Sequence, residues 1–270
     1  IRPVVFIGVG GSGNKTLRTL RQSLMRRLKQ GGWKGDDLPE CWQLLAIDTV
    51  TTDSPDGYPA PLLPESCYLG LVPRQATYNQ IITAMVQNTD STRRQDAFAG
   101  WLSETLNGNV AFGAGANRAV GRAISAANLG RMKDRIQDAY QTAKNATQDL
   151  ALVGECLKAS GTAGEPGAFI ITSLSGGTGS GMFLDVIEAA KAVDHEFGKR
   201  AQVILYGPDI FDPLLVRQAG AGIPSNTLAS VMEITGGIWR DEVSEGTEAL
   251  YQGGGLGQAL NAGRPGIGSF

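Results

Sequence analysis

The stretch GAFIITSLSGGTGSG at residues 167–181 decides the fold of this chain. Its first half is a run of apolar and β-branched residues, which is typical of a buried parallel strand. Its second half is a turn made of glycines and hydroxyl residues, and a helical pattern follows at once. The apolar positions of that pattern are Met182, Phe183, Val186, Ile187, Ala190 and Val193. We therefore expect a strand, a glycine turn and a helix in immediate succession.

The same arrangement begins the chain. Residues 3–9, PVVFIGV, predict a buried strand that ends in glycines, and a helix with a leucine every three or four residues follows. Further strands are predicted at 42–48 and 201–207. Further helices are predicted near 74–88, near 95–106, after residue 117 with a break near Gly130, and from about Asn226 to Trp239. Strands that alternate with helices predict a Rossmann-like α/β fold, in which a mostly parallel sheet carries helices on both faces.

Composition excludes several classes of protein. The net charge of −2 over 270 residues offers no basic field for nucleic acid. Cys41, Cys67 and Cys156 are far apart and form no CxxC pair, which argues against a disulfide framework and a zinc site, and favours a reducing compartment. No apolar run approaches the roughly 20 residues of a membrane span, and no signal-peptide layout is present. We therefore expect a cytoplasmic protein with no membrane segment and no nucleic-acid partner.

Three glycine-rich loops carry the candidate chemistry. We call residues 8–14, GVGGSGN, the first loop; residues 175–181, SGGTGSG, the second loop; and residues 113–122, GAGANRAVGR, the third loop. Each opens a helix, where backbone amides and the helix dipole can hold an anion. Two such cradles at strand-to-helix junctions imply a polyphosphate. The alternatives are a tight turn, a flexible hinge and a helix start with small residues for close packing.

These loops resemble those of the FtsZ/tubulin superfamily and occur in the order that the family shows. The second loop resembles the tubulin signature loop, the first loop is similar to the first glycine loop of FtsZ, and the third loop resembles the γ-phosphate loop of FtsZ. The start of the predicted helix at Asn226 suits the bacterial tubulin-like branch. The resemblance implies a GTP-binding domain at residues 1–240. A glycine-rich tail at 241–270 would then begin a missing C-terminal region.

The resemblance also implies a set of binding residues for GTP or GDP with Mg²⁺. The α- and β-phosphates would be held by Gly10, Gly11, Ser12, Gly13 and Asn14. The β-phosphate and its magnesium environment would involve Gly177, Thr178, Gly179 and Ser180, with Gly176 among the binding residues. The γ-phosphate would be sensed by Ala114, Gly115, Ala116 and Asn117.

The remaining positions concern the nucleoside and the metal. Asp209 and Asp212 would contact ribose, and Asn226 would bond guanine or serve only as a helix N-cap. Val50 stands where the family often has a carboxylate near magnesium, which leaves Asp48 as the candidate there. No residue is assigned as a metal ligand.

The sequence offers no catalytic residue. The acidic NxDxxD-like loop of the family is not found, because the acids Asp241, Glu242 and Glu245 lack its pattern. Hydrolysis of GTP would then need a missing C-terminal region or a neighbouring subunit, since phosphate-binding loops do not position the attacking water. The resemblance implies that the nucleotide governs head-to-tail self-association into a filament or a ring.

Other functions remain open from the sequence. A ThiF-like ATP-dependent adenylyltransferase explains the first loop and the stretch IDTV at 47–50, but not the second and third loops. A scaffold that binds nucleotide without hydrolysing it fits the missing acidic loop. An NAD-binding oxidoreductase, with Asp48 as its ribose-binding acid, is favoured least because it leaves two loops unused.

Overall fold

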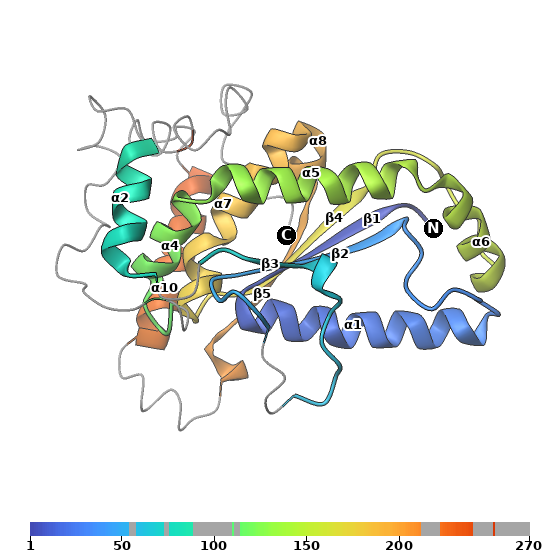
Figure 1. The fold of residues 1–270 in the computed structure, drawn as a ribbon, viewed down its shortest axis with the longest axis horizontal. Helices are drawn as coiled ribbons and strands as arrows, with labels where there is room; N and C mark the ends of the chain where they lie inside the picture. The colour runs from blue at the N-terminus through green and yellow to red at the C-terminus, as the bar shows by residue number, and fades with distance from the viewer. Residues whose placement is uncertain are drawn as a thin grey trace.

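A five-stranded parallel sheet forms the centre of the protein, with strand order β3-β2-β1-β4-β5 (Figure 1). The computed structural model describes residues 1–53, 58–72, 76–88, 110, 114–211, 222–239 and 251. The strands are β1 (Val4–Val9), β2 (Trp42–Asp48), β3 (Tyr68–Gly70), β4 (Gly167–Ser173) and β5 (Gln202–Tyr206). Every neighbouring pair is parallel. The predicted α/β fold is confirmed.

The order of the strands creates a switch point between β1 and β4. The chain proceeds from β1 outward to β2 and β3, and then returns to add β4 and β5 on the other side of β1. In open parallel sheets of this kind, ligands bind outside the carboxyl ends of the strands where the order reverses. The first loop follows β1 and the second loop follows β4, so both lie at this point.

Helices cover both faces of the sheet. Helix α1 (Gly10–Gln30) lies along one face, and α5 (Leu129–Asn145) runs along the other, beside α4 (Arg118–Ala126) and α7 (Gly177–Val193) (Figure 1). The remaining elements are η1 (Glu65–Cys67), α2 (Tyr78–Asn88), α6 (Thr147–Leu157), α8 (His195–Lys199), η2 (Pro208–Ile210) and α10 (Gly222–Trp239).

The side chains of β1 alternate between the two layers, as a strand covered on both faces requires. Val5, Ile7 and Val9 are fully buried in the large cluster that α4, α5 and α7 complete. On the other face, Phe6 packs in the cluster of Leu17 from α1 and stacks on Phe169 of β4 with ring centroids 5.4 Å apart. The long apolar runs in the sequence therefore report a buried sheet.

Two helix boundaries differ from the prediction. The break after the third loop lies at residues 127–128, before Gly130, because the Asn128 side chain donates a hydrogen bond to the Ile124 carbonyl and accepts one from Arg131. Helix α10 is already helical at Gly222, four residues ahead of Asn226. Pro224 therefore sits in its first turn, where a missing N–H costs nothing.

Some predictions fall outside the described residues. The helix near 95–106 lies there, and so does most of the predicted tail at 241–270, of which only Tyr251 is described. The division into a domain at 1–240 and a tail therefore stays a prediction. Among the described residues, no helix is both long enough and apolar enough to cross a membrane.

Candidate functional site

The first and second loops touch at the switch point. Gly10 has a φ of +70°, and a methyl group there would place its carbon 3.0 Å from the Gly179 amide nitrogen. A methyl carbon on Gly13 would lie 2.4 Å from the Ile171 carbonyl oxygen of β4. Distances below 3 Å are not tolerated without movement of the backbone, so glycine is needed at Gly13 for packing. Helices α1 and α7 consequently begin side by side.

The third loop meets the second loop by a direct backbone contact. The Gly177 amide donates a hydrogen bond of 2.9 Å to the Gly115 carbonyl, and a methyl carbon on Gly177 would lie 2.5 Å from that oxygen. Helices α4 and α7 pack equally closely, because a methyl carbon on Gly121 would lie 2.2 Å from the Gly177 carbonyl oxygen. The three glycine loops therefore converge on one place.

The starts of these helices have the electrostatics of an anion site. Helix α1 follows Val9 and α7 follows Gly176, and neither residue caps the helix with its side chain. Helix α4 is capped by Asn117, whose Oδ1 accepts from the Val120 amide at 3.3 Å. None of the three helices carries an acid in its first turn. The helix dipoles at these three N-termini, with no acid beside them, favour a negatively charged ligand.

The predicted binding residues divide into two groups by exposure. Those at least partly exposed are Gly11, Ser12, Gly115, Ala116, Asn117, Gly176, Thr178 and Asp209. Those buried are Gly10, Gly13, Asn14, Asp48, Ala114, Gly177, Gly179, Ser180 and Asn226. Asp212 lies outside the described residues. A methyl group on Gly11 or on Gly115 would meet no atom within 4 Å, so these two glycines leave room for a ligand to approach the backbone.

The buried binding residues stabilise the backbone that carries the exposed ones. Ser180 donates its hydroxyl and its amide to the Gly176 carbonyl, which closes the first turn of α7. Asp209 lies in η2, after β5, at the same edge of the sheet. The individual roles expected for these residues toward phosphate, ribose and guanine stay predictions.

A buried polar network links the first loop, the end of β2 and the second loop. The Asn14 Nδ2 donates to Asp48 Oδ2 at 3.0 Å, and the Thr49 amide donates to Asp48 Oδ1 at 2.7 Å. The Thr49 and Thr178 hydroxyls lie 3.1 Å apart. Burial raises the pKa of Asp48 to about 6, although hydrogen bonds from Thr49 and Thr178 oppose the rise. The Asn14 Oδ1 is buried and has no hydrogen-bond partner among the described residues.

Asn226 is placed differently from the N-cap alternative. It lies inside α10, and its Nδ2 donates to the Ala116 carbonyl at 2.8 Å and to the Ser175 carbonyl at 3.0 Å. Both hydrogens of the amide are thus used within the protein, and the second and third loops are joined through it. Only the Asn226 Oδ1 remains for a contact with a base.

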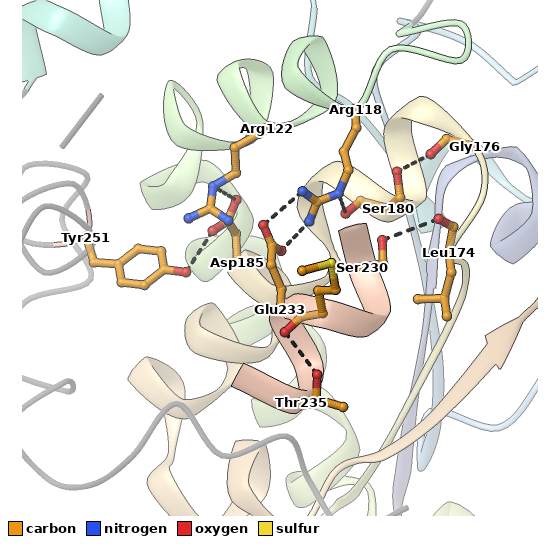
Figure 2. A network of polar contacts seen from close by, with 11 residues as sticks. Arg118, Arg122, Leu174, Gly176, Ser180, Asp185, Ser230, Glu233, Thr235 and Tyr251 are labelled. Atoms are coloured by element: carbon orange, nitrogen blue, oxygen red, sulfur yellow. Dashed lines mark hydrogen bonds and ion pairs between the residues drawn. The ribbon is translucent and has the colours of Figure 1, made fainter. Parts of the chain in front are cut away.

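Sequence reasoning missed an ion pair that joins the third loop to α10. Arg118, the first residue of α4, donates its Nε to the Ser180 carbonyl at 3.1 Å and pairs with Glu233 through both terminal nitrogens (Figure 2). The partners lie on separate helices far apart in the chain, so no local spacing announces the contact.

A second polar cluster fixes α4 against α7 behind the loops. Asp185 of α7 is fully buried, lies 3.5 Å from the Arg122 Nε of α4, and accepts a hydrogen bond of 2.8 Å from the Tyr251 hydroxyl (Figure 2). Burial raises the pKa of the Asp185 carboxyl, and the charge of Arg122 opposes that rise. A buried carboxylate needs such partners to remain ionised, so the contact holds the two helices in one relative position.

Comparison with known proteins gives one family. A family model described as "Tubulin like" matches residues 5–265. Among solved structures, the chain is similar to CetZ from Methanosaeta thermophila strain DSM 6194, at 14% sequence identity and a TM-score of 0.33. That alignment covers 95% of this chain and 61% of the CetZ chain, so this chain spans about 61% of the length of that protein. No curated protein sequence matches this chain.

Gly177, which packs against backbone, and Gly11, which faces open space, should respond differently to substitution by alanine. We expect Gly177→Ala to lower the free energy of unfolding by about 1–3 kcal/mol, because the new methyl group overlaps the Gly115 carbonyl. Gly11→Ala should change it by less than about 1 kcal/mol, with either sign, because the methyl group enters open space in a helical turn. Urea unfolding of both variants measures this. Equal losses in the two variants would show that Gly11 is also needed for packing.

The raised pKa of Asp48 predicts how stability depends on pH. The pKa of Asp48 in the folded protein lies above its ordinary value of 3.8, so the protonated carboxyl stabilises the folded state. This stabilisation is complete below pH 3.8 and is lost as the pH rises through about 6. The loss amounts to at most about 3 kcal/mol for a shift of this size. Asp48→Asn should therefore flatten the fall in stability between pH 4 and 7.

The variant Asp48→Asn should also keep the buried hydrogen bonds around position 48. An amide at position 48 can donate to the Asn14 Oδ1, which has no partner within the described residues, after both amides reorient, so the variant should be at least as stable as the native protein at pH 7. Urea unfolding at several pH values tests this. A parallel pH dependence in the two proteins would show that Asp48 is ionised throughout that range.

Proposed function

The chain belongs to the tubulin-like family, and from that premise we propose that it is a GTP-binding domain whose nucleotide lies at the switch point of the sheet. The observation that carries the proposal is the convergence of three helix N-termini without acids in their first turns. A polyphosphate is the ligand that such an arrangement suits, since each phosphate group can meet a separate set of amides. The open backbone at Gly11 and Gly115 supports the proposal.

Each loop then has a distinct task. The first and second loops hold the α- and β-phosphates through their amides, and the Thr178 hydroxyl adds a hydrogen-bonding group beside the β-phosphate. The third loop contacts the γ-phosphate through the exposed backbone at Gly115 and through Asn117. The Asn117 Oδ1 caps α4, which leaves its Nδ2 to donate to a phosphate oxygen.

The residues around Asp48 fit a magnesium ion that accompanies the nucleotide. Mg²⁺ prefers oxygen ligands, and the Asn14 Oδ1, the Asp48 carboxylate and the hydroxyls of Thr49 and Thr178 are all oxygens. A bound cation would also favour the ionised form of Asp48 against the effect of burial. The ion supplies charge neutralisation of the phosphates. The protein residues orient them.

Assembly and hydrolysis complete the proposed function. A nucleotide at the edge of the domain can be covered by a second copy, and such a head-to-tail contact is heterologous, so it gives a filament unless it closes into a ring. GTP hydrolysis is completed by the neighbouring subunit, because the loops supply phosphate binding and no residue that would position water. The acids Asp241, Glu242 and Glu245 lie outside the described residues.

Calorimetric titration with GTP, GDP and ATP in the presence of magnesium tests the nucleotide site. We expect the native chain to prefer guanine nucleotides, and Thr178→Val to weaken their binding by about tenfold or more, because it replaces a hydroxyl beside the phosphates by a methyl group of the same size. Thr83→Val is the matched control, since the Thr83 hydroxyl on α2 donates to the Asn79 carbonyl of its own helix.

The titration also separates the alternatives. Tighter binding of ATP than of GTP would favour the adenylyltransferase. Binding of GTP without turnover in the assembled protein would leave the non-hydrolysing scaffold. No binding of any nucleotide would contradict the proposed site.

A further inference from the structure

One face of α10 is bonded to the glycine loops. Asn226, Ser230 and Glu233 are spaced four and three residues apart and therefore lie on the same side of the helix. The Ser230 hydroxyl donates to the Leu174 carbonyl at 3.3 Å, just before the second loop, and Glu233 pairs with Arg118 of the third loop (Figure 2). Helix α10 thus spans the two loops that would hold the β- and γ-phosphates.

Asn226 makes the central contact of this face. The residue is 7% exposed, and its Nδ2 bonds one carbonyl from each loop, Ala116 and Ser175. Both acceptors are carbonyl oxygens, so the reverse orientation of the amide would place Oδ1 against two oxygens. The chemistry therefore fixes the orientation, and the side chain is a cross-link between two backbones.

The third loop depends on this cross-link more than the second loop does. Ser175 of the second loop keeps other contacts, since its amide donates to the Ser173 hydroxyl at 3.1 Å and its own hydroxyl lies 2.7 Å from the Thr227 hydroxyl. Within the described part of the chain, residues 114–116 of the third loop are tied to the second loop and α10 by two hydrogen bonds. These are Gly177 N–H to Gly115 and Asn226 Nδ2 to Ala116.

We propose that Asn226 is a positioning residue that holds the third loop in place for the terminal phosphate, and so sets the preference of the site for a nucleoside triphosphate over a diphosphate. The inference rests on the proposed function. Gly115 has a φ of +55° and is exposed, with no atom within 4 Å of where a Cβ would lie. Its position is therefore set by the hydrogen bonds on the other side of the loop. A loop ordered before binding gives tighter binding, because the ligand does not have to order it.

The test compares Asn226→Ala with Asn128→Ala. Asn128 is a similarly buried amide at the other end of α4, where it donates to the Ile124 carbonyl at 2.8 Å and accepts from Arg131. Without nucleotide, we expect amide hydrogen exchange at residues 114–117 and at Gly177 to be faster in Asn226→Ala and unchanged in the control. By calorimetry, the affinity of Asn226→Ala for GTP should fall about tenfold, and its affinity for GDP should change by less than about threefold.

A second variant keeps the test decisive if the alanine variant does not fold. Asn226→Ser retains one donor in a smaller side chain, so we expect the same selective loss of GTP affinity with a smaller magnitude.

Three results would count against the proposal in different ways. Equal losses of GTP and GDP affinity with unchanged ATP affinity would show that Asn226 contacts the base, which overturns the positioning role. Unchanged hydrogen exchange would overturn the bridge itself. Faster exchange in a protein whose native form binds no guanine nucleotide would overturn the proposed function and, with it, the triphosphate preference.

Discussion

The hydrogen bond from the Gly177 amide to the Gly115 carbonyl joins the second and third loops without any side chain between them. The close approach of Gly10 to the Gly179 amide does the same for the first and second loops. These contacts bring the N-termini of α1, α4 and α7 to the switch point of the sheet. A side chain at Gly177 would push α4 and α7 apart. The whole candidate site therefore depends on backbone-to-backbone packing at a few glycines.

Buried polar groups hold this packing in one arrangement. Asn14, Asp48 and Thr49 connect the first loop to β2, and Arg122 with Asp185 fixes α4 to α7. Such groups add little net stability, because removing charges from water costs about as much as the pairs return. These groups instead fix geometry, because each bond is satisfied in only one relative position of the helices. The loops are thereby ordered before any ligand arrives.

The sequence predicted the parts of this structure that depend on local pattern. Runs of apolar residues located β1, β2, β4 and β5, and glycine clusters located the three loops. The sequence could not distinguish Gly177, needed for packing, from Gly11, which faces open space, because that difference arises only when separate segments meet.

Contacts between distant elements were equally invisible in the sequence. The pair Arg118–Glu233 joins helices far apart in the chain, and nothing in the local spacing around either residue indicates it. The resemblance singled out Asn226 as a contact for guanine, and that role stays a prediction. Its two bonds to carbonyl groups could be found only from the folded structure.

The most direct measurement is a structure of the chain crystallised with magnesium and a slowly hydrolysed GTP analogue. We expect phosphates against the amides near Gly11, Gly115 and Gly176. A nucleotide bound elsewhere, with these amides facing only water, would contradict the proposed site.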